Sequence, residues 1–167
     1  MNWEDYEFEF NPDEIFYDDF YSYVNTKIKK LTDLKNQYIN LMSELTVCEE
    51  LDNQTFYNRL KEINSMGQII IAYKHITNGS IEIIGSGTVI VEPKIIRGGK
   101  PVAHIEDIVI KKTYRGQKIS QTILNELKVF AKLKKCYKVI LDCDEHVSGV
   151  YKSNGFEKKG IQMGLYF

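Results

Sequence analysis

The stretch HIEDIVIKKTYRGQKISQTILNELKVFAKLK, residues 104–134, combines a strand, a basic turn and an amphipathic helix. Residues 104–111 favour a strand, and apolar side chains at helical spacing predict a helix from about 120 to 134. Unpaired N–H groups at a helix start, together with the helix dipole, attract anions, so the turn at 113–116 is a candidate pyrophosphate site. Taken alone this signal is weak, because a basic turn before a helix is more often a solvated loop.

The segments before this stretch predict helices and a hairpin. Residues 24–31 fit a helix or a strand, and we expect a strand. A helix is expected over 33–45 and a second, short one after an N-cap at Asp52. Their expected buried side chains are Leu34, Tyr38, Leu41, Leu45, Phe56, Leu60 and Ile63.

Two β-rich runs, 68–77 and 81–91, flank Asn78-Gly79, the pair that a type I′ hairpin turn prefers. A loop over 93–103 then leads into the strand at 104–111. The alternation of helices and strands predicts an α/β (α+β) fold with a mixed sheet.

The segments after residue 134 complete the predicted sheet. Residues 137–143 are dense in Val, Ile and Leu and are expected to form a strand buried on both faces. A short helix follows over about 147–153 and ends at Asn154-Gly155, a good C-cap. The last residues, 156–167, are expected to form two short strands.

Composition limits the class of protein. The 167 residues suit one domain, and 22 Lys and Arg against 23 Asp and Glu give a net charge of −1, which argues against a nucleic-acid binder. No apolar run approaches the ~18 residues of a membrane span, and the acidic N-terminus argues against a secretory or transit signal. Three cysteines without a CxxC pair favour a reducing, cytoplasmic location, and the histidines show no spacing for a metal.

Residues 1–20 differ from the remainder of the chain, because they interleave acidic and aromatic side chains and contain no basic residue. We therefore divide the chain into an acidic, aromatic-rich arm over 1–20 and a domain over 21–167. The aromatic side chains lead us to expect that part of the arm packs on the domain.

The turn YRGQKIS, residues 114–120, resembles the acyl-CoA-binding motif Q/R-x-x-G-x-G/A of the GNAT superfamily of N-acetyltransferases. The match continues through HIEDI at 104–108, CYKVILDCD at 136–144 and YKSNGF at 151–156. This series is similar to the glucosamine-6-phosphate N-acetyltransferase family over about residues 94–163. The chain departs from these patterns at Lys118 and Ser120, where glycine or alanine is usual, and at Tyr166, where the family has arginine.

The resemblance implies a GNAT acyl-CoA N-acyltransferase fold, a mixed and twisted sheet flanked by helices. It implies transfer of acetyl from acetyl-CoA to the 2-amino group of D-glucosamine 6-phosphate, by direct attack in a ternary complex. The products are N-acetyl-D-glucosamine 6-phosphate, on the route to UDP-N-acetylglucosamine, and CoA. It further implies a homodimer and no metal.

The resemblance also assigns roles to residues. Tyr151 is the implied acid for the leaving thiolate, and Asp142 is implied to orient the amine through its backbone carbonyl. The implied coenzyme contacts are Ile108, Val109, Ile110, Arg115, Gly116, Gln117, Lys118, Ile119, Ser120, Gln121, Tyr151, Lys152 and Ser153. The implied contacts to the sugar phosphate are Thr46, Lys94, Ile95, Ile96, Arg97, Glu106, Asp107, Ile108, Tyr137 and Lys138, of which the last two can come from the second subunit.

Charge supports a phosphorylated acceptor, because Lys94, Arg97 and Lys100 give the 93–103 loop the cations that a sugar phosphate requires. Two alternatives stay open from the sequence. The chain can be a GNAT acetyltransferase of another amine, such as a polyamine, an aminoglycoside or a protein N-terminus. It can also be a CoA-binding module without enzymatic activity. Without the resemblance, Tyr151 would be interpreted as a core aromatic and His104 as a structural histidine.

Overall fold

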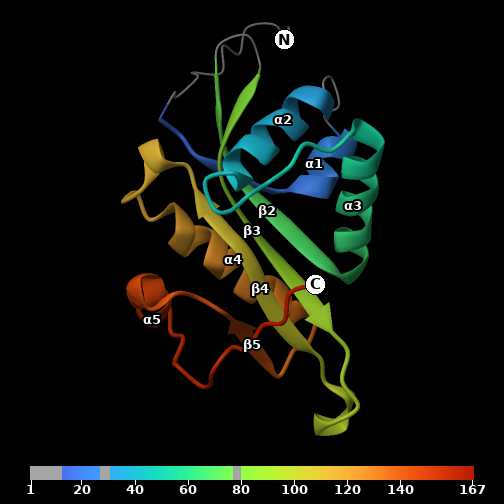
Figure 1. Ribbon diagram of the computed structural model, residues 1–167, viewed down its shortest axis with the longest axis vertical. Helices are drawn as coiled ribbons and strands as arrows, with labels where there is room; N and C mark the ends of the chain where they lie inside the picture. The colour runs from blue at the N-terminus through green and yellow to red at the C-terminus, as the bar shows by residue number, and fades with distance from the viewer. Residues whose placement is uncertain (1–12, 27–30, 77–79) are drawn as a thin grey trace, which may run out of the picture.

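A five-stranded sheet organises the described residues, 13–26, 31–76 and 80–167, of this computed structural model (Figure 1). The strands lie in the order β1 (Phe16–Asp19), β2 (Gly67–His75), β3 (Ile81–Glu92), β4 (Val102–Ile110) and β5 (Lys138–Leu141). The first four strands pair antiparallel, whereas β4 and β5 run parallel. The predicted mixed sheet is therefore confirmed.

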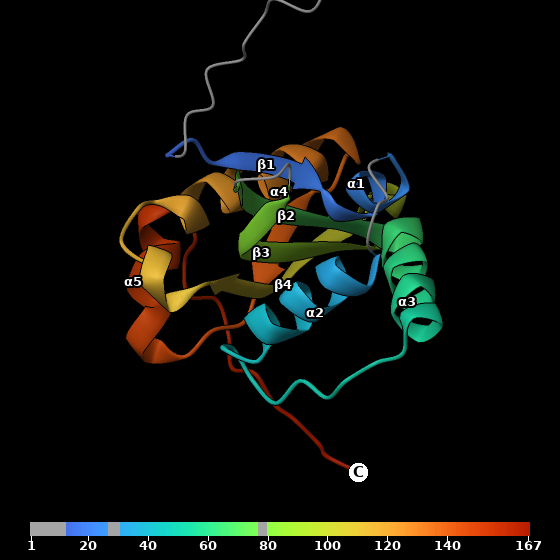
Figure 2. The same cartoon turned by 90° about the horizontal axis from the view of Figure 1, so that it is seen from above.

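Helices cover both faces of this sheet (Figure 2). One face packs against α1 (Phe20–Thr26), α2 (Leu31–Met42) and α3 (Asn53–Met66), and the other packs against α4 (Ile119–Leu133). The short helix α5 (Ser148–Ser153) follows β5. Each face has its own apolar core, as the implied GNAT architecture requires. No helix in the described ranges is both long enough and apolar enough to cross a membrane.

The predicted strand at 24–31 is wrong where the structure describes it. Residues 24–26 belong to α1, 27–30 lie outside the described residues, and Leu31 opens α2. Phe20, Tyr23 and Val24 explain the difference, because their i, i+3, i+4 spacing places all three buried side chains on one helical face.

The part of the arm that the structure describes contributes to the sheet. Residues Phe16–Asp19 form β1, which pairs with β2, and Phe20 is fully buried. The rings of Phe16 and Tyr73 stack with their centroids 5.7 Å apart. The expected packing of these aromatics is confirmed, and residues 16–20 belong to the folded domain, with 16–19 in the sheet and Phe20 at the start of α1.

The two helices expected after residue 32 are confirmed, with shifted ends. Asp52 caps α3 by accepting a hydrogen bond from the Thr55 N–H at 2.9 Å. In contrast, α2 ends at Met42, so Leu45 lies beyond it with 46% of its surface exposed and is not a core residue. The hairpin pairing of β2 with β3 is also confirmed, whereas Asn78-Gly79 lies outside the described residues.

Two expectations for the C-terminal third are wrong. β5 is not buried on both faces, because it is the last strand of the sheet and its residues are exposed or half-buried. Residues 156–167 form no strand, and the side chains of Ile161, Met163 and Phe167 are almost fully exposed. A strand needs a neighbour to pair its backbone groups, and the described residues place none beside this segment.

Candidate active site

The candidate site lies where β4 and β5 separate, halfway along β4. The β4–β5 pairing runs from Val102–Lys138 to Ile105–Leu141 and ends there. On the other side of β4, the register with β3 shifts between Ser86 and Thr88. The backbone of β4 from residue 106 onward thus keeps its partner strand on one side and leaves β5 on the other.

A β-bulge produces this shift. Asp107 adopts a left-handed conformation with φ of 53°, so that Asp107 and Ile108 together face Gly87 of β3. A side chain at Gly87 would place its Cβ 2.4 Å from the Ile108 Cδ1 and 2.7 Å from the Ile123 Cγ2. Glycine at this position therefore lets Ile108 and helix α4 approach the bulged strand.

Acidic side chains gather where the strands separate. Desolvation raises the pKa of Glu106, and the nearby carboxylates of Asp107 and Asp142 raise it further. Desolvation also raises the pKa of Asp107. Asp142 accepts a hydrogen bond from the Gln162 side-chain amide at 3.0 Å. Because these neighbouring carboxylates repel each other, this arrangement can attract a cationic amine.

Replacing Asp107 with asparagine is expected to increase stability and decrease activity. An acid whose pKa is raised on folding costs stability as the pH rises from its ordinary value of 3.8 through the raised value. Asparagine carries no charge and tolerates positive φ. The free energy of unfolding of D107N, measured in urea, should exceed that of the parent at pH 7 and converge with it below pH 3.8. A lower value for D107N at pH 7 would contradict this expectation.

Tyr151 of α5 lies at the edge of the core under α4. Its half-buried ring meets Phe156 edge-on with centroids 6.2 Å apart. Burial raises the pKa of Tyr151 above its ordinary value of 10.0, and the neighbouring Cys143 adds to this effect. The hydroxyl is therefore protonated at neutral pH and can donate a proton. Lys152 and Ser153 lie exposed on the same helix.

The turn between β4 and α4 exposes its backbone at a helix start. We call residues 112–118 the coenzyme turn, after the role that the sequence predicts for it; it opens with the 3₁₀ turn η4 (Lys112–Tyr114). Gly116 has φ of 83° and Lys118 has φ of 61°. Ile119 is buried, so only its backbone can face a ligand, whereas Arg115, Gly116, Gln117 and Lys118 are exposed.

Replacing Lys118 with glycine is expected to stabilise the protein. A non-glycine residue in the left-handed region costs about 1–2 kcal/mol, part of which glycine loses again through its greater freedom in the unfolded chain. A net gain of about 1 kcal/mol corresponds to a rise in Tm of about 2–4 °C for a chain of this size. Thermal unfolding measures it. Lys118→Ala, which removes the same charge but keeps the strained backbone, should show no such gain.

The basic loop before β4 contacts the start of β5. Arg97 opens the 3₁₀ turn η3 (Arg97–Gly99), and its guanidinium carbon lies 5.9 Å from the centroid of the Tyr137 ring. The Lys138 Nζ lies 5.7 Å from the same centroid. The Tyr137 N–H donates to the Pro101 carbonyl at 3.0 Å. Three of the predicted sugar-phosphate residues are thus adjacent.

The remaining residues of this loop are arranged differently. Lys94 forms an ion pair with Glu92, and the His104 Nε2 lies 2.8 Å from the other oxygen of that carboxylate. The hydrogen bonds from Lys94 and His104 lower the pKa of Glu92. Ile95 and Ile96 are 97% and 62% exposed. Neither isoleucine is part of the apolar core, so both are available for contacts outside this chain.

The predicted sugar-phosphate residues therefore form two groups. Lys138 and Leu141 stand at opposite ends of β5, about 10 Å apart at about 3.3 Å per residue. Arg97, Tyr137 and Lys138 lie at the first end, whereas Glu106 and Asp142 follow the second. Thr46 lies exposed in the loop after α2. Burial raises the pKa of the Cys48 thiol in the same loop, and the nearby carboxylate of Asp107 raises it further, so this loop lies close to Asp107.

The sequence did not reveal the carboxylates that hold these segments. Glu92 clamps Lys94 and His104, and Glu44 and Glu82 contact the residues at the coenzyme turn. Glu44 and Lys112 are 68 positions apart, so no local spacing could have linked them. The described ranges contain no group of three or more His, Cys, Asp and Glu that could hold a metal.

Comparison with known proteins identifies the family. Residues 36–156 match the acetyltransferase (GNAT) family. A glucosamine 6-phosphate N-acetyltransferase of Arabidopsis thaliana is 34% identical over 145 residues, which cover 84% of this chain and 96% of the relative. One from Candida albicans is 35% identical over 138 residues, covering 83% and 92%.

Solved structures agree with this result. The crystal structure of the glucosamine-6-phosphate N-acetyltransferase from Arabidopsis thaliana superposes with a TM-score of 0.78 at 28% identity, covering 93% of this chain and 99% of that one. An acetyltransferase from Trypanosoma brucei gives a TM-score of 0.78 at 26% identity, covering 92% and 100%. The fold and the matched sequence together show that this chain belongs to the acetyltransferase (GNAT) family.

Proposed function

We propose that the protein transfers acetyl from acetyl-CoA to the 2-amino group of glucosamine 6-phosphate, giving N-acetylglucosamine 6-phosphate and CoA. The observation that carries this proposal is the separation of β4 from β5 beyond Ile105 and Leu141, with Glu106, Asp142 and Tyr151 following it in the chain. The relatives named for this reaction support the acceptor.

The donor is proposed to lie along the second half of β4. β4 stays paired with β3 here but has lost β5, so alternate backbone groups over 108–110 are left for the amide groups of a pantetheine arm. The coenzyme turn and the start of α4, including Ser120 and Gln121, supply N–H groups for the diphosphate. Arg115 and Lys118 add positive charge there.

The acetyl group is proposed to move directly to the amine. Glu106 and Asp107 attract the ammonium form of the amine, which loses one proton to water, and the carbonyl of Asp142 orients the neutral amine. The nitrogen attacks the thioester carbon, and a backbone N–H near Ile108 stabilises the oxyanion. As the C–S bond breaks, Tyr151 gives its proton to the sulfur and regains one from the nitrogen.

The phosphate is proposed to bind Arg97 in a homodimer, beside Tyr137 and Lys138. This group lies at the far end of β5 from Asp142, so the phosphate cations of one chain fit the acceptor site of its partner better than their own. The exposed apolar side chains of Ile161, Met163, Leu165 and Phe167 support a partner chain that covers them. Sedimentation would report the dimer, and Phe167→Asp should weaken it.

Release of free thiol from acetyl-CoA tests the reaction. We expect a strong preference for glucosamine 6-phosphate over glucosamine and spermidine. Activity on plain amines but not on the sugar phosphate would replace the proposal with a related transferase. Coenzyme binding without thiol release would favour a non-enzymatic module.

The free cysteines Cys48, Cys136 and Cys143 suit a reducing compartment, and we place the protein in the cytoplasm.

A further inference from the structure

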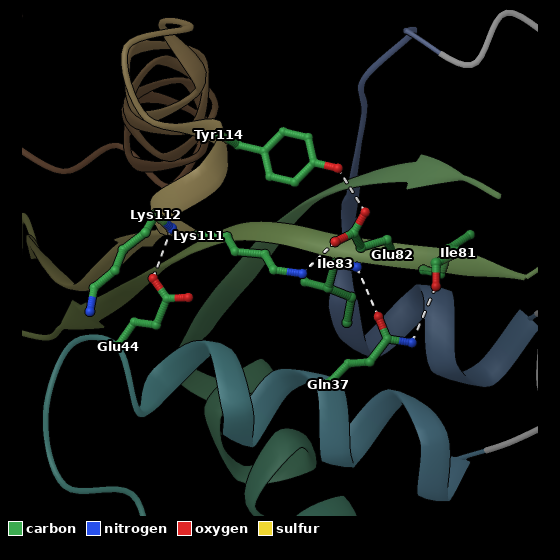
Figure 3. A network of polar contacts seen from close by, with 8 residues as sticks. All are labelled: Gln37, Glu44, Ile81, Glu82, Ile83, Lys111, Lys112 and Tyr114. Atoms are coloured by element: carbon green, nitrogen blue, oxygen red, sulfur yellow. Dashed lines mark hydrogen bonds and ion pairs between the residues drawn. The ribbon is translucent and has the colours of Figure 1, made fainter.

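Two carboxylates from other parts of the chain hold the start of the coenzyme turn (Figure 3). Glu44 follows α2, and Glu82 lies on β3. Figure 3 shows Glu44 reaching the backbone of Lys112, while Glu82 contacts Lys111 and Tyr114. Neither acid belongs to the acidic group at the end of the β4–β5 pairing.

Glu44 connects the segment after α2 to the coenzyme turn. Its Oε2 accepts a hydrogen bond from the Lys112 N–H at 2.8 Å and lies 3.7 Å from the Arg115 Nη2. The Arg115 Nε donates to the Ile110 carbonyl at 3.0 Å. Gln37 anchors α2 itself, because its amide exchanges hydrogen bonds with β3 at the Ile81 carbonyl and the Ile83 N–H. The Glu44 carboxylate is therefore presented from a turn that directly follows an anchored helix.

Glu82 holds the other side of the turn. One carboxylate oxygen forms an ion pair with Lys111, and the other accepts a hydrogen bond from the Tyr114 hydroxyl at 2.7 Å. Burial alone would raise the pKa of Glu82, but the bonds from Lys111 and Tyr114 bring it below its ordinary value. The carboxylate is thus ionised at neutral pH and ties the two ends of residues 111–114 together.

We infer that Glu44 and Glu82 are positioning residues that pre-organise the coenzyme turn for the diphosphate of the donor. Backbone N–H groups bind an anion well only when they already point at it, because ordering a loop on binding costs about 1–2 kcal/mol per residue. This inference rests on the proposed donor site, because it takes the coenzyme turn to bind the diphosphate. Neither acid touches the reacting atoms.

Glu44 also carries a negative charge near Arg115, which opposes an anionic ligand. Removing the charge and removing the hydrogen bond thus act in opposite directions on donor binding. Glu44→Gln removes the charge but keeps an oxygen for the Lys112 N–H, whereas Glu44→Ala removes both. If positioning dominates, alanine weakens donor binding and glutamine restores it.

The test compares two thioester donors, acetyl-CoA and S-acetylpantetheine, which lacks the diphosphate. Glu44→Ala and Glu82→Ala should raise the KM for acetyl-CoA about 3- to 10-fold, while the KM for S-acetylpantetheine changes less than about 2-fold. Tyr114→Phe, which removes only one hydroxyl, should act in the same direction with a smaller effect. Glu62→Ala is the matched control, because Glu62 pairs with Arg59 on the exposed side of α3, away from the coenzyme turn.

Two results would overturn the inference. Equal penalties on both donors would mean that the two acids merely maintain the fold, and an unchanged KM for acetyl-CoA would mean that they do not prepare the turn. The proposed donor site fails separately: the unmodified protein would then use S-acetylpantetheine with the same KM as acetyl-CoA. Tyr114→Phe and Glu44→Gln keep the comparison possible if an alanine variant does not fold.

Discussion

Replacing Tyr151 with phenylalanine is expected to lower kcat about 100-fold and to change the Kd for CoA by less than about 2-fold. The substitution removes one oxygen and keeps the ring against Phe156. Without the hydroxyl, the thiolate leaves with no proton donor beside it. Because Tyr151 donates only while protonated, kcat of the parent should decline at a pH above 10, and the variant should not show this decline. Steady-state thiol release and calorimetry measure the two effects.

Tyr57 provides a control for this prediction. Tyr57 lies on α3, and its hydroxyl donates to the Asn25 side chain of α1, far along the chain from α5. Tyr57→Phe should therefore leave kcat unchanged. If Tyr151→Phe also left kcat unchanged, the tyrosine would be a core aromatic and another group would protonate the sulfur.

Replacing Arg97 with alanine is expected to raise the KM for glucosamine 6-phosphate about 10- to 100-fold with little change in kcat. Arg97 is the residue of the basic loop that lies against the Tyr137 ring, which Lys138 also contacts, whereas Lys94 is already paired with Glu92. Glucosamine, which has no phosphate, should show the same KM with both proteins. A phosphate bound elsewhere would leave the KM for the sugar phosphate unchanged.

Backbone strain at Arg97 needs its own control. Arg97 has φ of 59°, so alanine inherits a left-handed conformation that glycine adopts freely. Arg97→Gly should therefore repeat the kinetic effect without a backbone penalty. Arg59→Ala removes an exposed arginine from α3 and should not change the KM.

The two variants together test whether the site is shared between subunits. In a mixed dimer of Tyr151→Phe and Arg97→Ala chains, a shared site would combine the intact Tyr151 of one chain with the intact Arg97 of the other. At a glucosamine 6-phosphate concentration far below the KM of the Arg97→Ala protein, where neither variant alone is active, random mixing should then restore about a quarter of the parent activity. If each site used its own Arg97, mixing would restore nothing.

The sequence predicted the layers of the fold because their signals are local. The helical spacing of Ile123, Leu124 and Leu127 and the β-rich runs on either side of residue 78 can each be recognised within one element. The prediction failed at residues 24–26 and 156–167, where the outcome depends on partners elsewhere. Phe20 and Tyr23 favour a helix that packs on the sheet, and the C-terminal residues have no strand beside them.

The candidate site divides in the same way. The sequence by itself predicted the coenzyme turn, Tyr151 and the strand before Asp142, because each lies in a short motif that resembles a motif of the family. Only the tertiary structure decided that Asp107 forms a bulge and that Glu44 and Glu82 hold the turn. The reason is physical: a carboxylate finds a backbone N–H 68 positions away only after the helix and the sheet that carry them have packed.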